Sequence, residues 1–496
     1  MKNYILMELR IMMLMKNFII LICLSISLCA WSKEVKLYHQ ANDLLDISER
    51  AYERSGRVAE QIDSIDMSRS FSVFIRVKTD ARQLGKKALV TNKKVLSLQD
   101  RGFIIGTQEN GSWMVGFSDG KNEPWEYSPT AKRQPINDGK WHYIGLTHDA
   151  DKQEMRMYYD GRNVAIYCTN GNNNLATHNP FRLGGIDNSQ WNAFNGYMKD
   201  FYFTDKVLDE EAVRKKCGKE ANVLQDTLLA TTVPNIKIMT FNIYHGGREL
   251  GEEVGVNRVI DVIRQVSPDV IGIIETYGSG AIIADALGYY FYLRSSNLSI
   301  MSRYPIEETH DFFKSFNCSA ATIRISAKQK INYLNIWLDY LPNTHEQLQN
   351  RMSPDSIVAG EWKTRAKELN SILKDMRKMI ADTRRPLFVS GDFNIASHLD
   401  WGEDMKTEHD GYIIEWPTSK LMEDAGFKDS YRVVHPDPSK KPCLTWSTMA
   451  KNELQYRIDY IYYKGKVKPI DSWMIDKHPV RFPSDHAAVS TLFEFF

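Results

Sequence analysis

The hydrophobic pattern of the chain changes at Pro234, and this change constrains the fold more than any other feature. From about Phe71 to Phe203, short alternating or aromatic-rich strands are separated by Gly, Asn and Asp turns, with little helical periodicity. After Pro234, apolar strands alternate with helices of 3.6-residue periodicity. Because 496 residues are too many for one hydrophobic core, the sequence predicts an all-β domain followed by an α/β domain.

The N-terminal residues 1–32 have the order of a secretory signal peptide. Lys16 precedes the apolar run from Phe18 to Leu28, and small residues surround Ala30. The run is shorter than the roughly 20 residues of a spanning helix, so we expect no transmembrane span. We expect export to a periplasm, a cell surface or the extracellular medium. Cys29 is a candidate lipidation site, although Leu28 stands where a bacterial lipoprotein signal has a small residue.

The four cysteines beyond this segment are widely spaced. They are Cys168, Cys217, Cys318 and Cys443, and no pair has the spacing of a zinc motif. In an oxidising compartment Cys168 and Cys217 could form a disulfide, but spacing alone does not determine connectivity.

Three details of the first half resemble a laminin-G-like, concanavalin-type jelly roll: the motif Asp138-Gly-Lys-Trp-His142, the turn Asp160-Gly161 and the closing segment Phe194 to Phe203. The resemblance covers residues 35–220 and implies an all-β sandwich that ends in a helical turn opened by acidic residues. Such domains often bind sugars or calcium, but we find no compact acidic loop for calcium. We therefore expect an accessory domain with a glycan as candidate ligand, and a linker at 221–234.

In the second half, two amphipathic helices are expected. Val256, Val259, Ile260 and Ile263 lie on one helical face, and Ser267-Pro268 ends that helix before the apolar strand Asp269 to Glu275. The second helix carries Ala366, Leu369, Leu373, Met376 and Ile380 on one face and precedes the strand Leu387 to Ser390.

Polar motifs stand at the ends of the apolar strands in this half, where side chains from different strands can converge on one rim of a sheet. They are Thr240-Phe-Asn242, Glu275, Gly391-Asp-Phe-Asn394, Arg457-Ile-Asp459 and Ser484-Asp-His486. Each one alone has an ordinary explanation as a turn, a cap or a helix opening. Their order and their strand-end positions together favour a functional site.

The set resembles the endonuclease/exonuclease/phosphatase family over residues 235–496. This resemblance implies a four-layer αββα sandwich and a metal-dependent phosphoester hydrolase. Such hydrolysis needs a hard cation, a positioned water molecule and donors for the phosphoryl oxygens, and carboxylates, amides and a histidine supply these.

By this resemblance Glu275 is the main Mg²⁺ ligand, with Asn242 and Asp485 beside it and Mn²⁺ as an alternative metal. Asp392 orients or deprotonates the attacking water, and Asn394 contacts the phosphate.

The same resemblance makes His486 the residue that stabilises the phosphoryl oxygens, with Asp459 as its supporting acid. A carboxylate partner orients an imidazole and favours its charged form.

The chain departs from the family pattern on the strand Tyr333 to Tyr340, where Trp337 occupies the position of a histidine that many members carry. Tyr340 can supply the missing phosphate contact, while Trp337 can simply pack in the core. His245, before two glycines, and His398, near Asp400, are further candidates for substrate contact. The alternatives are a plain turn for His245 and a tied-down loop for His398 and Asp400.

The first hypothesis is an exported phosphodiesterase or phosphatase that acts on a small molecule or a lipid headgroup. A secreted nuclease is the second. It is not favoured, because the net charge is +1 and the basic tracts are only short pairs such as Arg384-Arg385 and Lys440-Lys441. The third is a non-catalytic glycan-binding protein. The intact set of strand-end residues argues against this third hypothesis.

Overall fold

The computed structural model describes residues 67–79, 85–94, 97–179, 182–185, 194, 196–218, 232–450 and 452–496, together with the backbone of short strands at 34–36 and 45–46. The signal-like residues 1–32, with Cys29, and most of the expected linker 221–234 lie outside this part of the chain. The domain boundaries expected there stay a prediction. Within the described part, none of the helices combines the length and the apolar character needed to cross a bilayer.

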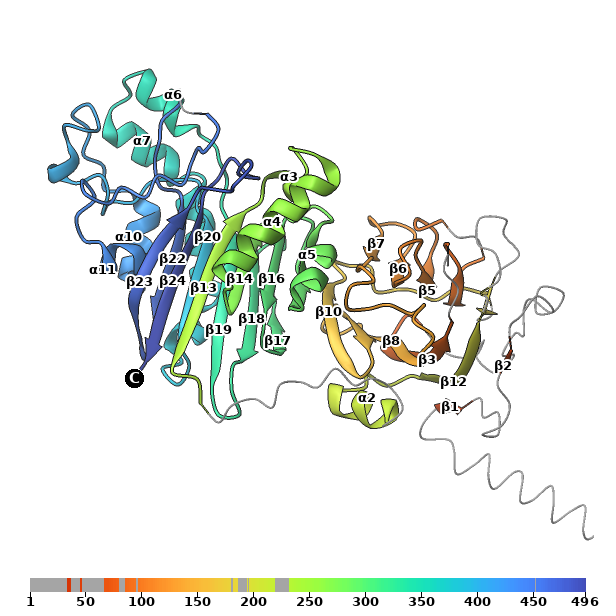
Figure 1. Ribbon diagram of the computed structural model, residues 1–496. Coiled ribbons are helices and arrows are strands. Elements are labelled where there is room, and N and C mark those ends of the chain that lie inside the picture. Colours follow the sequence, from red (N-terminus) through yellow and green to blue (C-terminus); the bar gives the residue numbers. More distant parts are fainter. Residues whose placement is uncertain are drawn as a thin grey trace, which may run out of the picture.

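The first domain is a β-sandwich, as expected (Figure 1). One sheet contains, in order, β12 (Tyr197–Thr204), β3 (Phe71–Lys78), β8 (His142–Asp149), β9 (Glu154–Tyr159) and β10 (Arg162–Cys168), with β1 (Glu34–Lys36) and β2 (Leu45–Asp46) paired to β12. The facing sheet contains β11 (Arg182–Leu183), β4 (Ala88–Thr91), β5 (Gly102–Thr107), β6 (Trp113–Ser118) and β7 (Trp125–Tyr127).

Alternation along β3 explains how this domain buries both faces of one sheet. Phe71 and Val73 point into the core between the two sheets, whereas Phe74 packs on the opposite face under the helix α2 (Glu210–Cys217). The side chain of Asp209 accepts a hydrogen bond of 2.8 Å from the backbone of Ala212 and caps α2. The acidic start of a helical turn predicted after the closing strand is therefore confirmed.

The second domain is the predicted four-layer αββα sandwich. Its first sheet runs β15 (Tyr290–Leu293), β16 (Leu298–Ser302), β14 (Val270–Ile274), β13 (Asn235–Asn242), β24 (Ala488–Phe495) and β23 (Val467–Ile475). Its second sheet runs β17 (Ile306–His310), β18 (Cys318–Arg324), β19 (Lys330–Trp337), β20 (Leu387–Asp392), β22 (Asp459–Lys464) and β21 (Lys428–Asp429). Ile238, Tyr333 and Phe388 belong to the core that the two sheets share.

Helices cover the outer faces of both sheets. The helices α3 (Tyr244–Gly247), α4 (Glu252–Val266) and α5 (Gly280–Leu287) follow strands of the first sheet, and α4 and α5 lie across it in Figure 1. The second sheet is accompanied by α6 (Thr344–Gln349), α7 (Pro354–Glu361), α8 (Arg365–Asp375), α9 (Arg377–Ala381), the 3₁₀ turn η2 (Glu403–Met405), α10 (Pro417–Asp424) and α11 (Ser430–Val434).

The predicted apolar face of α4 is confirmed, because Val256, Val259, Ile260 and Ile263 are all buried against the first sheet. The second predicted helix is divided in two. Helix α8 ends at Asp375, and Met376, which separates it from α9, has a backbone (φ −87°, ψ 10°) outside the helical region. The side chain of Met376 is fully buried, as its place on the predicted apolar face requires, but the periodicity does not reveal the break in the backbone.

The two domains share one continuous sheet, which the sequence did not predict. Strand β10 of the sandwich pairs in parallel with β15, with Ile166 opposite Tyr292, so that the first sheet and the sandwich sheet form a single 13-stranded sheet. Gln134 Nε2 donates to Asp285 Oδ1 across this junction at 2.9 Å.

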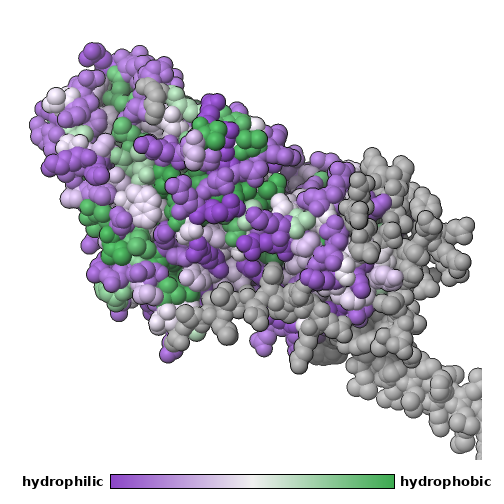
Figure 2. All heavy atoms as spheres, in the orientation of Figure 1, coloured by the Kyte–Doolittle hydropathy of each residue, from purple (hydrophilic) through white to green (hydrophobic). Residues whose placement is uncertain are grey.

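Figure 2 shows a mostly hydrophilic face with separate apolar patches on the second domain, as folded chains normally present.

The candidate disulfide between Cys168 and Cys217 is not formed. Both residues are free thiols. Cys168 ends β10, where its Sγ accepts a hydrogen bond of 3.0 Å from Arg294, whereas Cys217 packs in the cluster under α2. The two side chains therefore belong to different environments of the sandwich.

Candidate active site

The strand-end residues predicted from the sequence converge on one rim, between the two central sheets. Asn242 ends β13 and Glu275 directly follows β14, its parallel neighbour in the first sheet. Asp392 ends β20 in the second sheet and is paired in register with Asp459, the first residue of the antiparallel β22. His486 lies just before β24. Parallel strand ends and antiparallel strand starts thus meet at the same edge.

The side chain of Asn242 connects these residues across the two sheets. Its Nδ2 lies 3.2 Å from Glu275 Oε1 and 3.2 Å from Asp392 Oδ2, and 3.5 Å from His486 Nε2. The residue is almost fully buried, so this amide is held among charged groups with little water around it.

Glu275 and Asp485 form the part of the rim that best suits a hard divalent cation. Burial raises the pKa of Asp485, and the nearby Glu275 raises it further. Among the residues that the structure describes, Asp485 Oδ1 is buried without a hydrogen-bond partner. A partnerless buried carboxylate oxygen next to a second carboxylate is the arrangement that a bound cation would satisfy.

Asp392 is buried and has both carboxylate oxygens engaged. Oδ1 accepts from the backbone N–H of Asn394 at 2.9 Å, and Oδ2 accepts from Asn242. Burial raises the pKa of Asp392 to about 7, and Asp459 adds to this effect while His486 opposes it. A carboxyl with this pKa is a better base near neutral pH than an exposed one.

His486 lies between two carboxylates. Its Nδ1 is 2.9 Å from Asp459 Oδ2 and its Nε2 is 3.9 Å from Asp392 Oδ2. Burial alone would lower the pKa of His486, but Asp459 and Asp392 outweigh it and raise the pKa to about 10. The imidazole is therefore charged at neutral pH.

Asp392, Asp459 and His486 can also be considered as a metal triad, because their ligating atoms lie within 4.8 Å of one another. A protonated imidazole has no free lone pair for a metal, however, and its Nδ1 is already bonded to Asp459. The carboxylates of Glu275 and Asp485 are thus the better candidate ligands.

Asn394 follows Asp392 in a left-handed backbone conformation (φ 53°). Its side-chain Nδ2 donates to the carbonyl of Leu338 at 2.8 Å, which leaves one N–H of that amide for a phosphate oxygen. The buried Arg365 donates to the carbonyl of Asn394 at 2.9 Å and to that of Pro342 at 2.7 Å. No motif in the sequence identified Arg365 as a support of the site.

The loop that carries His398 and Asp400 is tied to the scaffold. His398 Nδ1 is 2.7 Å from Ser419 Oγ and its Nε2 is 3.3 Å from Glu423, both on α10. Asp400 is buried and forms an ion pair of 2.8 Å with Arg457, which lies two residues before β22. The geometry therefore favours the loop-tying alternative over substrate contact for both residues.

Aromatic side chains flank the rim on the Asp392 side, and of these Phe316 and Tyr340 are exposed whereas Trp337 is half-buried. Trp337 is paired in register with Asp392, its ring centroid is 5.4 Å from that of Phe316, and it is 6.5 Å from that of Tyr340. Tyr340 is 58% exposed, so it is available to a substrate rather than packed in a core.

His245 is also exposed, on the Glu275 side of the rim. Its backbone N–H donates to Glu275 Oε2 at 2.7 Å, and its ring stacks on Tyr244 with centroids 4.7 Å apart. The hydrogen bond that His245 Nδ1 donates to the carboxylate of Glu249 raises the pKa of His245. The residue thus helps to hold Glu275 and still presents a side chain to solvent.

Two family models match the chain. The endonuclease/exonuclease/phosphatase family model matches residues 239–486, and the model of the concanavalin A-like lectin/glucanase superfamily matches residues 55–214. Among curated proteins, the uncharacterized protein F14F9.5 of Caenorhabditis elegans is 29% identical over 310 residues, which cover 53% of this chain and 93% of that protein.

Solved structures match about half of the chain. A truncated TDP2 from C. elegans is 19% identical, with 52% of this chain and 98% of that chain covered and a TM-score of 0.37. An AP endonuclease from Archaeoglobus fulgidus is 20% identical, with 52% and 99% covered and a TM-score of 0.39. An endonuclease/exonuclease/phosphatase family protein from Bacteroides thetaiotaomicron is 14% identical, with 53% and 99% covered and a TM-score of 0.39.

Proposed function

The chain belongs to the endonuclease/exonuclease/phosphatase family, and from this premise we propose that it is an exported, Mg²⁺-dependent phosphodiesterase or phosphatase. In the broad sense it is a phosphoester hydrolase, as members of this family are phosphoesterases and nucleases. The main observation that supports a metal-dependent hydrolytic site is the contact of Asn242 Nδ2 with both Glu275 and Asp392. This contact supports the proposal, because it brings the carboxylates of Glu275 and Asp392 to one buried amide.

Glu275 and Asp485 would hold the metal, with Asn242 beside them. Mg²⁺ is the proposed ion because the donors are oxygens, and Mn²⁺ would fit the same donor set. When bound, the ion would polarise a phosphoryl oxygen and neutralise part of its charge. The unpartnered Asp485 Oδ1 supports this assignment.

Asp392 is the proposed base for the attacking water. Its raised pKa lets it accept a proton near neutral pH. Asn242 and Asn394 fix its two oxygens, so the water would be oriented toward the phosphorus and attack in line. This reaction requires no covalent intermediate.

His486 is the proposed donor to the phosphoryl oxygens in the transition state. Asp459 holds its Nδ1, so Nε2 is the ring atom that points toward Asn242 and Asp392. A fixed, buried positive charge stabilises developing negative charge more strongly than a solvated one. Asn394 would contribute its remaining N–H to the same group.

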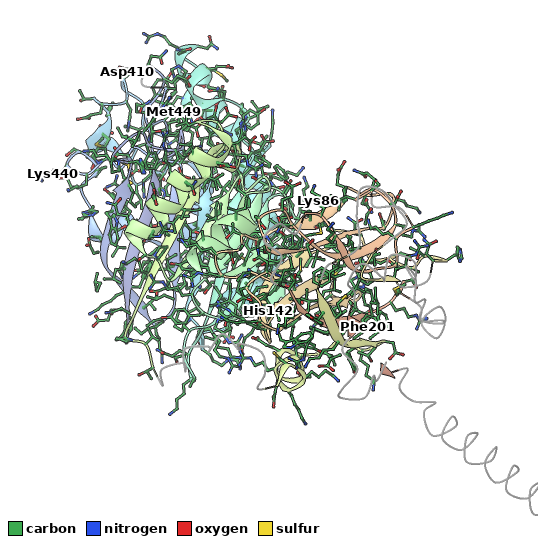
Figure 3. All side chains as sticks on the ribbon, turned by 45° about the vertical axis from the view of Figure 1, so that its right-hand side comes forward. Lys86, His142, Phe201, Asp410, Lys440 and Met449 are labelled. Carbon is green, nitrogen blue, oxygen red and sulfur yellow. The ribbon has the colours of Figure 1, made fainter. Side chains whose placement is uncertain are left out.

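The substrate test uses purified protein with bis-p-nitrophenyl phosphate, p-nitrophenyl phosphate and plasmid DNA, in Mg²⁺, in Mn²⁺ and in EDTA. We expect metal-dependent turnover of an ester substrate. Turnover of DNA alone would replace the proposal by the nuclease alternative. Asp410→Asn is the matched control for carboxylate variants, because Asp410 is exposed at the tip of the second domain (Figure 3).

Export is proposed from the N-terminal sequence alone. The order of a basic residue, an apolar run and small residues supports it. Cell fractionation of a tagged chain tests it, and retention of the tagged protein in the cytoplasm would contradict it.

Glycan binding by the sandwich would be tested by adding this protein to a glycan array.

A further inference from the structure

The turn from Arg294 to Asn297, between β15 and β16, contacts the β-sandwich on one side and the Glu275 segment on the other. We propose that through this turn the sandwich holds the metal carboxylate Glu275 in place, with Arg294 and Asn297 as positioning residues. The inference rests on the proposed function, since it assigns a support to the same metal site.

On the sandwich side, Arg294 is held by Cys168, the last residue of β10, and by Asn170, two residues further along the chain. Asn170 Nδ2 donates to the carbonyl of Arg294 at 2.9 Å, and Arg294 Nη1 donates to Cys168 Sγ at 3.0 Å. These contacts continue the parallel pairing of β10 with β15, which ends with Tyr167 opposite Leu293. The sandwich therefore fixes both the backbone and the guanidinium of Arg294.

Within the second domain, the same guanidinium is anchored to the neighbouring sheet. Its Nε donates to the carbonyl of Cys318 at 3.3 Å, and Nη2 forms an ion pair with Asp311. Arg294 is only 5% exposed, so its planar group is locked by partners from both domains rather than free to move in solvent.

The other end of the turn holds the backbone of the Glu275 segment. Asn297 Oδ1 accepts from the N–H of Glu275 at 3.1 Å, and the carbonyl of Asn297 accepts from Thr276 at 3.0 Å. The carbonyl of Ser296 accepts from Tyr277 at 2.8 Å. The backbone N–H groups of Glu275, Thr276 and Tyr277 therefore all donate to residues of this one turn.

This support is needed because Glu275 has a left-handed backbone conformation. Its φ of 58° is unfavourable for a residue with a side chain and persists only where the surroundings impose it. Asn297 is buried, and its Nδ2 donates to the carbonyl of Phe316 at 3.0 Å, which fixes the amide that holds Glu275. If the turn shifts, the carboxylate of Glu275 shifts with it.

A second interdomain contact offers a matched control at the opposite end of β15. Arg162 of the sandwich donates to the carbonyl of Gly288 at 3.1 Å and lies over the ring of Tyr290 at 4.1 Å. It joins the same two domains but does not contact the 294–297 turn. If the interface only stabilised the protein, substitutions of Arg162 and of Arg294 would have the same effect on Mg²⁺ binding.

The test measures Mg²⁺ binding to the full chain by titration calorimetry, beside thermal unfolding followed by circular dichroism. The variants are Arg294→Met, Asn170→Asp and the control Arg162→Met. Asn170→Asp keeps the shape and tolerates the left-handed backbone of that residue, but it cannot donate to Arg294. It therefore carries the test if Arg294→Met does not fold.

We expect Arg294→Met and Asn170→Asp to weaken Mg²⁺ binding by about 10-fold, as loss of a supporting contact at a metal site does. Arg162→Met should bind Mg²⁺ as the unaltered chain does, even if it unfolds at a lower temperature. Unchanged binding in Asn170→Asp, or equal weakening in Arg162→Met, would overturn the inference. If Glu275→Gln binds Mg²⁺ as tightly as the unaltered chain, the proposed metal site itself is wrong.

Discussion

Asp459 Oδ2 lies 2.9 Å from His486 Nδ1, and this hydrogen bond joins the two central sheets of the second domain. Asp459 begins β22 of one sheet, and His486 precedes β24 of the other. The bond fixes which ring nitrogen faces Asn242 and Asp392, and it keeps the imidazole charged.

Asp459→Asn should therefore reduce kcat by about 100-fold or more, the usual cost of losing a fixed transition-state donor. The amide removes the negative charge that raises the pKa of His486. Mg²⁺ affinity should change little, because Asp459 is not among the proposed ligands. The measurement is steady-state kinetics with calorimetry, and a kcat equal to that of Asp410→Asn would contradict the assignment.

Gly391→Ala should destabilise the second domain and abolish turnover. Gly391 has a φ of 145°, and an added Cβ would lie 2.0 Å from the carbonyl oxygen of Ile336 on β19. Relief requires β20 to move away from β19, which displaces Asp392, the next residue. We expect a loss of more than about 1 kcal/mol in the free energy of unfolding. Denaturant unfolding measures this loss.

Gly411→Ala is the control for that experiment. Gly411 also has a positive φ (87°), but no atom lies within 4 Å of its added Cβ. The comparison separates the backbone strain of a positive φ, which both positions have, from the steric clash, which only Gly391→Ala would cause. Equal effects of the two substitutions would show that the close approach of β20 to β19 is not what requires Gly391.

The stability of the sandwich should depend on pH through His142, which lies inside this domain (Figure 3). Its ring nitrogens lie 2.9 Å from Asp160 Oδ2 and 2.9 Å from Asp138 Oδ1. Burial lowers the pKa of His142, but these carboxylates outweigh it and the net shift is upward. A raised pKa contributes stability below the unfolded-state value of about 6.5, which is lost as pH rises through the folded-state pKa.

Thermal unfolding of the chain and of His142→Asn, compared from about pH 6 to 9, tests this linkage. The difference in stability should shrink as pH rises. His148, in the same domain, has a pKa that burial lowers. His148→Asn, compared with the unaltered chain below about pH 6.5, should give the opposite slope, and the same slope in both variants would refute the explanation.

The isolated fragment 232–496 should unfold at a lower temperature than the full chain and should aggregate more readily. Without the sandwich, β15 becomes an unpaired edge, and Phe291 loses its contact with Tyr167 at a centroid distance of 5.9 Å. Light scattering and thermal unfolding measure these effects. A fragment as stable and soluble as the full chain would show that the shared sheet contributes nothing.

The fold class and the strand-end residues could be predicted because each leaves a local signal. Alternation distinguishes the sandwich from the α/β half, and motifs such as Gly391 to Asn394 occupy consecutive positions. Asp392 and His486 lie in separate segments, but the resemblance of the whole set to the family indicated that they belong to one site.

The supports of the site could not be predicted, because they depend on contacts between distant segments. Arg294, Asn297 and Arg365 are single polar residues without a motif, and only the tertiary structure shows which carbonyls and N–H groups they meet. The pairing of β10 with β15 leaves no signal either, because both strands resemble ordinary buried strands. Whether Cys168 and Cys217 form a disulfide could not be decided from the sequence for the same reason, since sequence spacing does not report side-chain position.

In the proposed mechanism Glu275 holds the metal and Asp392 activates the water. The most direct test measures Mg²⁺ binding and ester hydrolysis together in the unaltered chain, in Glu275→Gln and in Asp392→Asn. We expect Asp392→Asn to bind Mg²⁺ but to lose turnover, whereas Glu275→Gln should lose both at the same Mg²⁺ concentration. Full turnover in EDTA, or full turnover in Asp392→Asn, would contradict it.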